Sequence, residues 1–432
     1  MVGPNYSQRS EDYLRPNEPA KKHKRGRFGG LIVTLVIIIA LVVTAAYVIR
    51  FRNSHHTFAA DSRTPKSVEN ALSDYSSRIR QAILKPQEDA DAEAAVGAVT
   101  DDVSKLAILN ATGLTENEYL KPQQATVNQV VASFTKKPSG YEVLTYQTSV
   151  VEYTPQEGTT ITINGVKKDL LVTSTSQMHR LSMKAENGIG NLSVNKDEVV
   201  SPSAAPTATT MLATLPQEDG EAAKPASSSA TSASGFNPGR AVEYAENWAQ
   251  VGAESVDDAE VRGGRYPGEV LNQKYPYYGN DNCANFVSQA LAAGGLKRAN
   301  SLKLDVKNPD AWSDGLWLTL GVKATRTWTL ANANFAYMLS KSGHYVQAGE
   351  ADGKSMEQMA GLKPGSLIYA AWNGGENKDH VALVVGQLSR GKKSQPIISQ
   401  KGWNQYNMPL SAHRAHELQQ HKNARWTALA VK

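Results

Sequence analysis

The sequence predicts an α+β protein in three parts: a single transmembrane helix, a small extracellular α+β domain and a larger C-terminal α+β domain. Three observations support this prediction. Residues 29–49 carry no charge. Helical spacing of apolar residues then gives way to strand-like segments between 62 and 200. Finally, a stretch rich in Ser, Ala, Thr and Pro separates this part from a C-terminal region that contains all seven tryptophans.

The uncharged segment 29–49 is long enough to cross a bilayer. At a rise of about 1.5 Å per residue it spans about 31 Å, and its core exceeds the apolar stretch of a cleaved signal peptide. Residues 1–28 carry seven Lys/Arg against three Asp/Glu, which places this basic tail in the cytoplasm. We therefore expect a single-pass protein of the cell membrane, with an uncleaved anchor and the remaining chain outside.

Residues 62–200 begin with helical patterns and end with strands. Helical spacing covers residues 68–84, 95–109 and 125–134, and strand-like segments start at Tyr141. Asn164-Gly165 and Asn187-Gly188 between the strands are typical of hairpin turns. This part has no cysteine, and His179 is its only histidine. We expect a spacer or a domain that contacts a protein partner.

Residues 201–237 predict a disordered linker, because such a composition cannot bury enough apolar surface to fold. From 238 onward the pattern predicts helices first and an antiparallel sheet afterwards. Helices are expected at 238–249 and 328–339, and strands at 366–372, 380–386 and 396–399. We therefore place a second domain at residues 238–432.

The chain's single cysteine, Cys283, stands where a helix is expected to begin. Asp281 or Asn282 is expected to cap that helix. A thiol at a helix N-terminus feels the positive end of the helix dipole, which favours the thiolate. The alternative is an inert cysteine, since a lone thiol is most often a small buried apolar group. The apolar face and the glycine stop of this helix are Phe286, Val287, Ala290, Leu291, Gly294 and Gly295.

His380 stands at the start of the predicted strand 380–386, 97 residues after Cys283. Thiol nucleophiles need an imidazole to accept and return a proton, so the pair is a candidate catalytic dyad. A zinc site made by Cys283, His380 and either His344 or His413 is the alternative. These residues lack the short spacing of common zinc ligands, so we expect no metal and no cofactor.

The segment 281–291, Asp-Asn-Cys-Ala-Asn-Phe-Val-Ser-Gln-Ala-Leu, with Gly294-Gly295, resembles the signature of an amidase-domain family of bacterial surface proteins. The turn 362–365, Leu-Lys-Pro-Gly, and the later Asp379-His380-Val381 are similar to its second half. The resemblance covers about residues 238–432. It implies a papain-like fold related to the NlpC-like and CHAP peptidoglycan hydrolases.

The resemblance implies that Cys283 is the nucleophile and His380 the base. The family usually has Asp where this chain has Asn282, and often His-Thr where Lys401 stands. The third catalytic residue is left open between Gln400 and Asn404, whose amide oxygens could orient the imidazole.

The other expected contributions concern the oxyanion and the substrate. The oxyanion hole is expected to use the backbone N–H of Cys283 and a donor from the loop of Tyr278, beside Asn282. Trp372 is expected near the cleft, where it could stack on substrate.

These expectations lead to a membrane-anchored extracellular cysteine hydrolase that cleaves amide bonds in bacterial cell-wall peptide or peptidoglycan. A net charge of +5 over 238–432 suits an anionic wall weakly, and no basic aromatic-rich helix indicates nucleic-acid binding. The alternative is a catalytically decayed wall-binding or scaffold protein, suggested by Asn282 and Lys401. Which bond is cleaved stays open.

Overall fold

The computed structural model describes a set of segments that lie almost wholly beyond the predicted membrane helix and outside the linker. They are residues 64–84, 119–186, 191–200, 235–250, 271–299 without 273, 277, 279 and 280, 305–315, 323–352, 357–402 and 404–432. In these segments no helix is long and apolar enough to cross a bilayer. The predicted anchor 29–49, the predicted helix 95–109 and the predicted turn Asn187-Gly188 lie outside the described residues.

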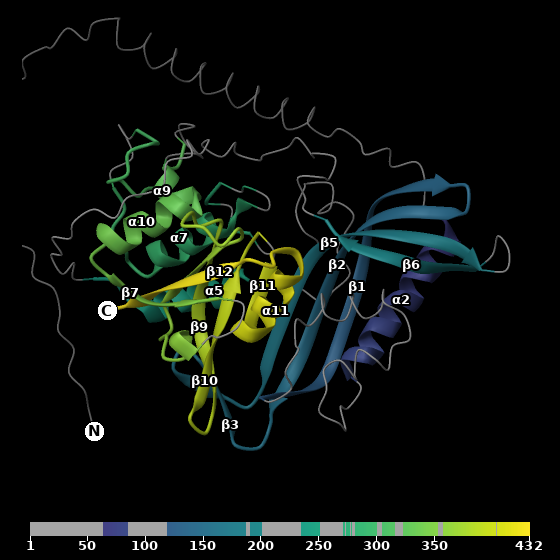
Figure 1. The fold of residues 1–432 in the computed structure, drawn as a ribbon, viewed down its shortest axis with the longest axis horizontal. Helices are drawn as coiled ribbons and strands as arrows, with labels where there is room; N and C mark the ends of the chain where they lie inside the picture. Colours follow the sequence, from purple (N-terminus) through teal and green to yellow (C-terminus); the bar gives the residue numbers. More distant parts are fainter. Residues whose placement is uncertain are drawn as a thin grey trace, which may run out of the picture. The chain divides into compact units, whose positions relative to one another are not determined.

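The N-terminal part packs one helix on a strongly extended antiparallel sheet (Figure 1). The helix is α2 (Lys66–Leu84), and its predicted apolar stripe from Val68 to Ile83 is buried. The sheet strands are β1 (Leu120–Lys137), β2 (Gly140–Pro155), β5 (Leu171–Glu186) and β6 (Asn191–Val199). The segments expected to be a helix and the first strands are thus found as such from α2 and β2 onward.

The helix predicted at 125–134 is wrong, because this segment is the middle of β1. Its residues pair with β2, for example Val127 with Ser149 and Val130 with Tyr146. Apolar residues at three- and four-residue spacing suggested a helix, but the segment is rich in β-branched residues, which favour strands. Pairing with β2 along almost its whole length decides the outcome.

The hairpin predicted at Asn164-Gly165 is confirmed. It joins β3 (Thr159–Ile163) to β4 (Val166–Lys168), and both turn residues have positive φ, 51° and 75°. β3 also pairs with β9 (His380–Arg390) of the C-terminal part, where Ile163 faces Gly386. A Cβ at Gly386 would lie 2.1 Å from the carbonyl oxygen of Thr162, so this close approach requires glycine.

The C-terminal part has its helices first and most of its strands later, as expected. The helices are α5 (Pro238–Trp248), α7 (Cys283–Ala293), α9 (Arg326–Thr329) and α10 (Ala331–Ser340), followed by the short η4 (Glu357–Met359) and later by α11 (Leu410–Gln420). The strands are β7 (Tyr345–Ala351), β8 (Leu367–Ala371), β9, β10 (Lys393–Gln400), β11 (Asn404–Pro409) and β12 (Arg425–Val431). The sequence did not predict β7, β11, α11 or β12.

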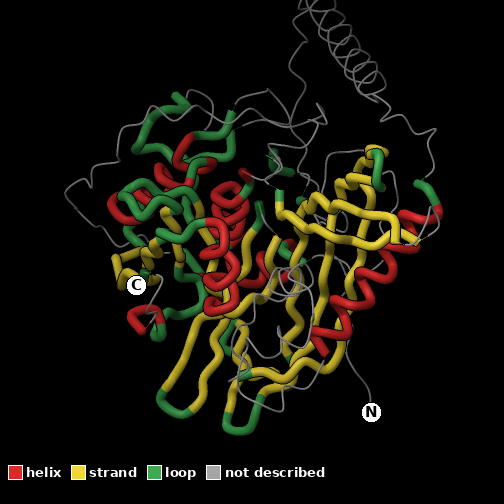
Figure 2. The backbone as a smooth tube through the Cα atoms, turned by 45° about the vertical axis from the view of Figure 1, so that its right-hand side comes forward, coloured by secondary structure: helices red, strands yellow, loops and turns green. Residues whose placement is uncertain are grey.

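The strands of both parts form one sheet, which the sequence did not predict. Its order is β1-β2-β5-β11-β10-β9-β8-β12-β7, and β3 joins at β9. The link is the pairing of β5 with β11, in which Ser176 faces Asn404 and Ser174 faces Tyr406. Figure 2 shows the strands of the two parts running on from each other. The boundaries 62–200 and 238–432 stay predictions, but the two parts share main-chain hydrogen bonds.

The two faces of β9 bury different surroundings. Val381 and Leu383 belong to an apolar cluster that includes residues of α5 and α7. Ala382 and Val384, whose side chains alternate to the other face, belong to a smaller cluster with residues of α11 and with Trp426. β9 therefore lies between the helix that carries Cys283 and helix α11.

Candidate active site

Cys283 is the first residue of α7, and its side chain is buried. Asn282 occupies the N-cap position with φ −92° and ψ 0°, not the usual extended conformation, and its side chain makes no capping hydrogen bond. The expected cap by Asn282 is therefore wrong. Its Oδ1 instead accepts hydrogen bonds from the backbone N–H of Tyr278 at 3.4 Å and from Nδ2 of Asn285 at 2.7 Å. Asn282 thus ties the tyrosine loop to the first turn of α7.

Buried hydrogen bonds fix the next turn of α7. Nδ2 of Asn285 also donates to the carbonyl oxygen of Pro276 at 2.7 Å, and Nε1 of Trp328 donates to Asn285 Oδ1 at 2.7 Å. One turn further on, the hydroxyl of Ser288 donates to the carbonyl of Trp328 and accepts from Nε1 of Trp312. A buried polar network with satisfied partners is rigid, so the position of the thiol is well determined.

His380, the first residue of β9, is hydrogen-bonded to the Cys283 side chain. Its Nε2 lies 2.7 Å from Oε1 of Gln400, the last residue of β10. Because an amide oxygen only accepts hydrogen bonds, Nε2 carries a proton, and Nδ1 is the nitrogen that remains to face the sulfur. Thiol, imidazole and amide therefore form a line, the arrangement that nucleophilic thiol chemistry requires.

The surroundings of His380 favour its protonated form. Burial, the largest influence, lowers its pKa, but the charge of Cys283 and the hydrogen bond with that side chain raise it. The Glu417 carboxylate and the hydrogen bond to Gln400 raise the pKa further, so that the net pKa lies above 6.5. An imidazolium beside a thiolate is thus stabilised at this position.

Aromatic rings cover both faces of the His380 imidazole. Trp372 stacks on one face with 5.5 Å between the ring centroids, and His413 stacks on it at 6.2 Å. Trp372 also stacks on His421 at 4.6 Å. The backbone N–H of Trp372 donates to Asp379 at 2.8 Å, which holds the tryptophan beside the histidine. Trp372 therefore meets the catalytic imidazole itself, whereas we had expected it only near the cleft.

Of the two amide candidates for the third residue, Gln400 contacts the imidazole and Asn404 does not. Both polar atoms of the Asn404 side chain are buried without a hydrogen-bond partner. In β11 the Gln405 side chain reaches His413 and that of Tyr406 reaches Glu246. Strand alternation then puts Asn404 on the side of Tyr406, away from Gln405.

The remaining candidates, Tyr278 and Lys401, are both buried. The backbone N–H of Tyr278 is engaged by Asn282. Burial holds the pKa of the Tyr278 phenol well above its usual value, so the hydroxyl keeps its proton as a potential donor. Lys401 is only 2% exposed and follows Gln400 directly, and it is Gln400 that bonds to the imidazole.

Sequence reasoning missed Glu417 and gave His413 a role only in the zinc alternative. Both belong to α11 and are buried, with Glu417 Oε1 3.7 Å from His413 Nδ1 and 3.4 Å from His416 Nδ1. The available signal was the pattern His413, His416, Glu417, which puts all three on neighbouring positions of a helix. No group of three or more His, Cys, Asp or Glu side chains in the described part of the chain could hold a metal ion.

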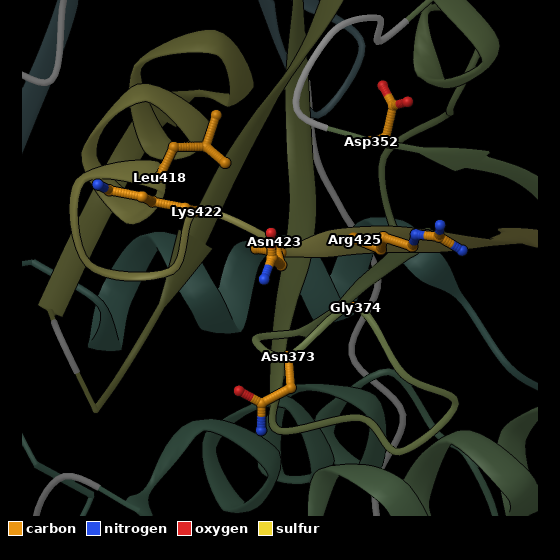
Figure 3. A pocket seen from close by; sticks show the side chains of 8 residues that line it. Asp352, Asn373, Gly374, Leu418, Lys422, Asn423 and Arg425 are labelled. Carbon is orange, nitrogen blue, oxygen red and sulfur yellow. The ribbon is translucent and has the colours of Figure 1, made fainter.

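A polar pocket adjoins the outer end of the ring stack (Figure 3). Asn373 and Lys422 line it, and they directly follow Trp372 and His421 in the chain. In Figure 3 the side chains of Lys422 and Arg425 extend away from each other. The full lining comprises Asp352, Asn373, Gly374, Leu418, Lys422, Asn423, Ala424 and Arg425.

Comparison with known proteins agrees with this part of the chain. Residues 235–426 match the family model described as a putative amidase domain. The match confirms the amidase-domain resemblance for this region and indicates amide-bond hydrolysis as its chemistry. No curated protein and no solved structure matches the chain. The relation to papain-like, NlpC-like and CHAP hydrolases remains a prediction.

Proposed function

We propose that the chain is a cysteine amidase in which Cys283 is the nucleophile, His380 the general acid and base, and Gln400 the residue that orients the imidazole. The observation that carries the proposal is the hydrogen-bonded line of these three side chains. The family match at residues 235–426 supports amide hydrolysis. The departures at Asn282 and Lys401 do not weaken the proposal, because Asn282 has a role in the loop and Gln400 supplies the acceptor.

The first half of the reaction forms a thioester. The Cys283 thiolate attacks the carbonyl carbon of the amide, and the carbonyl oxygen becomes an oxyanion. Backbone N–H groups in the first turn of a helix have no partner within the helix, so the N–H of Cys283 can donate to this oxyanion, with the Tyr278 hydroxyl as second donor. The C–N bond then breaks, and the leaving amine takes the proton of the His380 imidazolium.

The second half regenerates the enzyme. Neutral His380 removes a proton from water, and the hydroxide attacks the thioester carbonyl. The C–S bond breaks, and the product leaves as a carboxylic acid with the Cys283 thiolate beside the imidazolium again. Gln400 holds the imidazole in one orientation through both halves, because its Oε1 keeps the proton on Nε2.

We further propose that the substrate is a peptide of the bacterial cell wall and that residues 29–49 anchor the protein in the cell membrane. Two features of the sequence support this. The apolar run with its basic N-terminal flank places the C-terminal region outside, and the stretch 201–237 has a composition typical of a flexible linker.

The test compares the full chain with Cys283→Ala on muropeptides and on simple peptide amides. We expect kcat/KM to fall by at least about 10³-fold, as when an enzyme loses its nucleophile. Cys283→Ser is the matched variant of nearly the same volume. Equal turnover by the parent chain and Cys283→Ala would end the proposal. Because the chain has a single cysteine, labelling by iodoacetamide also counts active sites directly.

A further inference from the structure

Helix α11 buries an acidic group beneath the catalytic histidine. Glu417 and the neighbouring His413 and His416 are each at most 2% exposed. Burial, the largest influence, raises the pKa of Glu417, but the hydrogen bond and charge of His416 and the charges of His413 and His380 lower it to about 2. Glu417 is therefore a fully buried carboxylate that stays ionised throughout the neutral range.

The hydrogen bonds of His413 define it as a neutral ring. Its Nε2 accepts from Nε1 of Trp426 at 3.4 Å, so Nδ1 carries the proton and donates to Oε1 of Gln405 at 2.9 Å. Burial lowers the pKa of His413 to about 4, since the attraction of Glu417 does not outweigh it. His413 thus stacks on His380 without adding a positive charge.

His416 is held from the N-terminal part of the chain. Nε2 of Gln177 in β5 lies 2.6 Å from Nε2 of His416. The amide nitrogen of glutamine only donates, so His416 Nε2 accepts, and its Nδ1–H faces Oε1 of Glu417 at 3.4 Å. Gln177 and His416 are 239 positions apart in the chain.

The strand pairing between β5 and β11 puts Gln177 in this place. Thr175 faces Gln405, the residue that bonds to His413, and Ser176 faces Asn404. Since side chains alternate along a strand, Gln177 lies on the same face of the sheet as Thr175 and Gln405, the face that α11 covers. The pairing of the two parts thus delivers a hydrogen-bond donor to the buried cluster.

We propose that Gln177 is a positioning residue of the amidase: it holds His416, and through it the Glu417 carboxylate, so that this negative charge stabilises the imidazolium of His380. Strands β1 to β6 are then a working part of the catalytic unit and not a spacer. The inference rests on the proposed function, since it assigns a role within the same thiol–imidazole pair.

The groups that face His380 allow the direction of the effect to be worked out. They are the Cys283 thiol from α7, the Gln400 amide from β10, and His413 and Glu417 from α11. Asp379, the preceding residue, is engaged by the N–H of Trp372. Removing the negative charge of Glu417 destabilises the imidazolium, so the proton of His380 is lost at lower pH.

The experiment measures the rate of alkylation of Cys283 by iodoacetamide against pH in the full chain. The profile has a lower inflection, where the ion pair forms, and an upper one, where the imidazolium loses its proton. We expect Glu417→Gln to move the upper inflection down by about one pH unit, and Gln177→Leu to move it in the same direction by less. Ser176→Ala is the matched control, since its hydroxyl is buried without a partner and lies on the other face of β5.

Thermal unfolding of each variant shows whether it is folded. If Glu417→Gln does not fold, Gln177→Leu decides, with Gln177→Met as a second variant that refills the space. Upper inflections identical to that of the parent chain in folded Gln177 variants overturn the inference, as does an equal shift in Ser176→Ala.

The alkylation measurement needs no turnover, so the two proposals fail separately. A shift of the upper inflection in a chain that hydrolyses no amide supports the positioning role while the amidase proposal fails. Amide hydrolysis by a chain whose variants leave the upper inflection in place overturns the positioning role alone. The same pH series on kcat/KM, where turnover exists, should show the alkaline limb move with the alkylation profile.

Discussion

The chain buries two histidine–carboxylate pairs in similar surroundings and uses them differently. In the N-terminal part, Nδ1 of His179 lies 2.7 Å from Oδ1 of Asp197, and the hydroxyl of Tyr75 donates to Oδ2 at 2.7 Å. In the C-terminal part, Glu417 lies 3.4 Å from His416. Both pairs join a helix to a sheet, but only the second lies beside the imidazole that meets the thiol.

The difference shows that position, and not composition, gives such a pair its role. Tyr75 on α2 and His179 on β5 occupy one oxygen of Asp197 each, so this carboxylate clamps the helix to the sheet. Glu417 is free to act on a neighbouring charge, because His380 lies next to its partner His413. The first pair should therefore control stability and the second the titration of the site.

The largest effect is expected from Asp197→Ala. The substitution leaves the hydroxyl of Tyr75 and Nδ1 of His179 buried without their partner, which should lower the free energy of unfolding by about 3–5 kcal/mol. Urea unfolding measures it. Glu198→Ala is the control, because Glu198 is partly exposed and its contacts with Lys196 and Arg180 lie at the surface; it should cost less than about 1 kcal/mol.

The comparison breaks if Asp197→Ala, at a temperature where it is folded, moves an inflection of the Cys283 alkylation profile as far as Glu417→Gln does. Both pairs would then act on the site, and the clamp would not be purely structural.

The second effect is a loss of stability in acid that comes from His413. Its pKa is lowered to about 4 from 6.5, so below pH 6.5 the unfolded chain binds a proton that the folded chain does not. Stability from this group is present above pH 6.5 and is lost as the pH falls to about 4, by about 3 kcal/mol at about 1.4 kcal/mol per unit. His380 acts in the opposite sense, since its raised pKa contributes stability below pH 6.5 that is lost as the pH rises through it.

Urea unfolding at pH 7.5 and at pH 4.5 checks the acid loss. We expect His413→Gln to be less stable than the parent chain at pH 7.5 but to lose much less on acidification. Arg414→Gln on the same helix is the control and should keep the full acid loss. A parent chain that is as stable at pH 4.5 as at pH 7.5 would contradict the neutral, buried state of His413.

The site was predictable where local pattern carries it. Cys283 begins a helix and His380 begins an apolar strand, and both positions follow from capping and periodicity along a few residues. Gln400 emerged as one of two candidates, and only the 2.7 Å contact separates it from Asn404. Glu417 was out of reach, since its role depends on α11 packing beneath β10 and β11.

The fold was predictable to the same extent and failed for a similar reason. Strand β11 reads Asn-Gln-Tyr-Asn-Met-Pro and lacks apolar alternation, yet most of it is buried, because β5 and β10 cover its edges and α11 its face. The joined sheet depends on pairing between residues more than 200 positions apart. No local signal reports such pairing, as the helical spacing that masked β1 also shows.

The third effect separates orientation from charge. Gln400→Leu removes the acceptor for Nε2–H of His380, and we expect kcat/KM to fall by about 10²-fold, a typical share of positioned acid–base catalysis. The upper alkylation inflection should move down less than in Glu417→Gln, because Gln400 carries no charge. Gln405→Leu is the control, as Gln405 bonds to His413 and not to His380.

Equal losses of kcat/KM in Gln400→Leu and Gln405→Leu would show that the contact of Gln400 with the imidazole has no special role. Unchanged activity in Gln400→Leu would remove Gln400 from the proposed site.

The smallest effect comes from a new carboxylate beside the sulfur. Asn282 uses its Oδ1 to accept from Tyr278 and Asn285, and aspartate, which the resembling family usually has there, accepts the same bonds. Asn282→Asp should therefore keep the loop in place and change kcat/KM by only a few-fold. Its negative charge next to Cys283 disfavours the thiolate, so the lower alkylation inflection should rise by up to about one unit.

Asn282→Asp and Glu417→Gln thus act on opposite ends of the same pH range. A carboxylate added near the sulfur raises the lower inflection, while a carboxylate removed from beneath the imidazole lowers the upper one, and the two together should narrow the range additively because the sites lie on different elements. Asn282→Ala, which loses the acceptor without gaining a charge, should lower kcat/KM and leave the lower inflection in place. If Asn282→Asp moves the upper inflection instead, the charge at 282 acts on His380 and the division between a thiol side and an imidazole side is wrong.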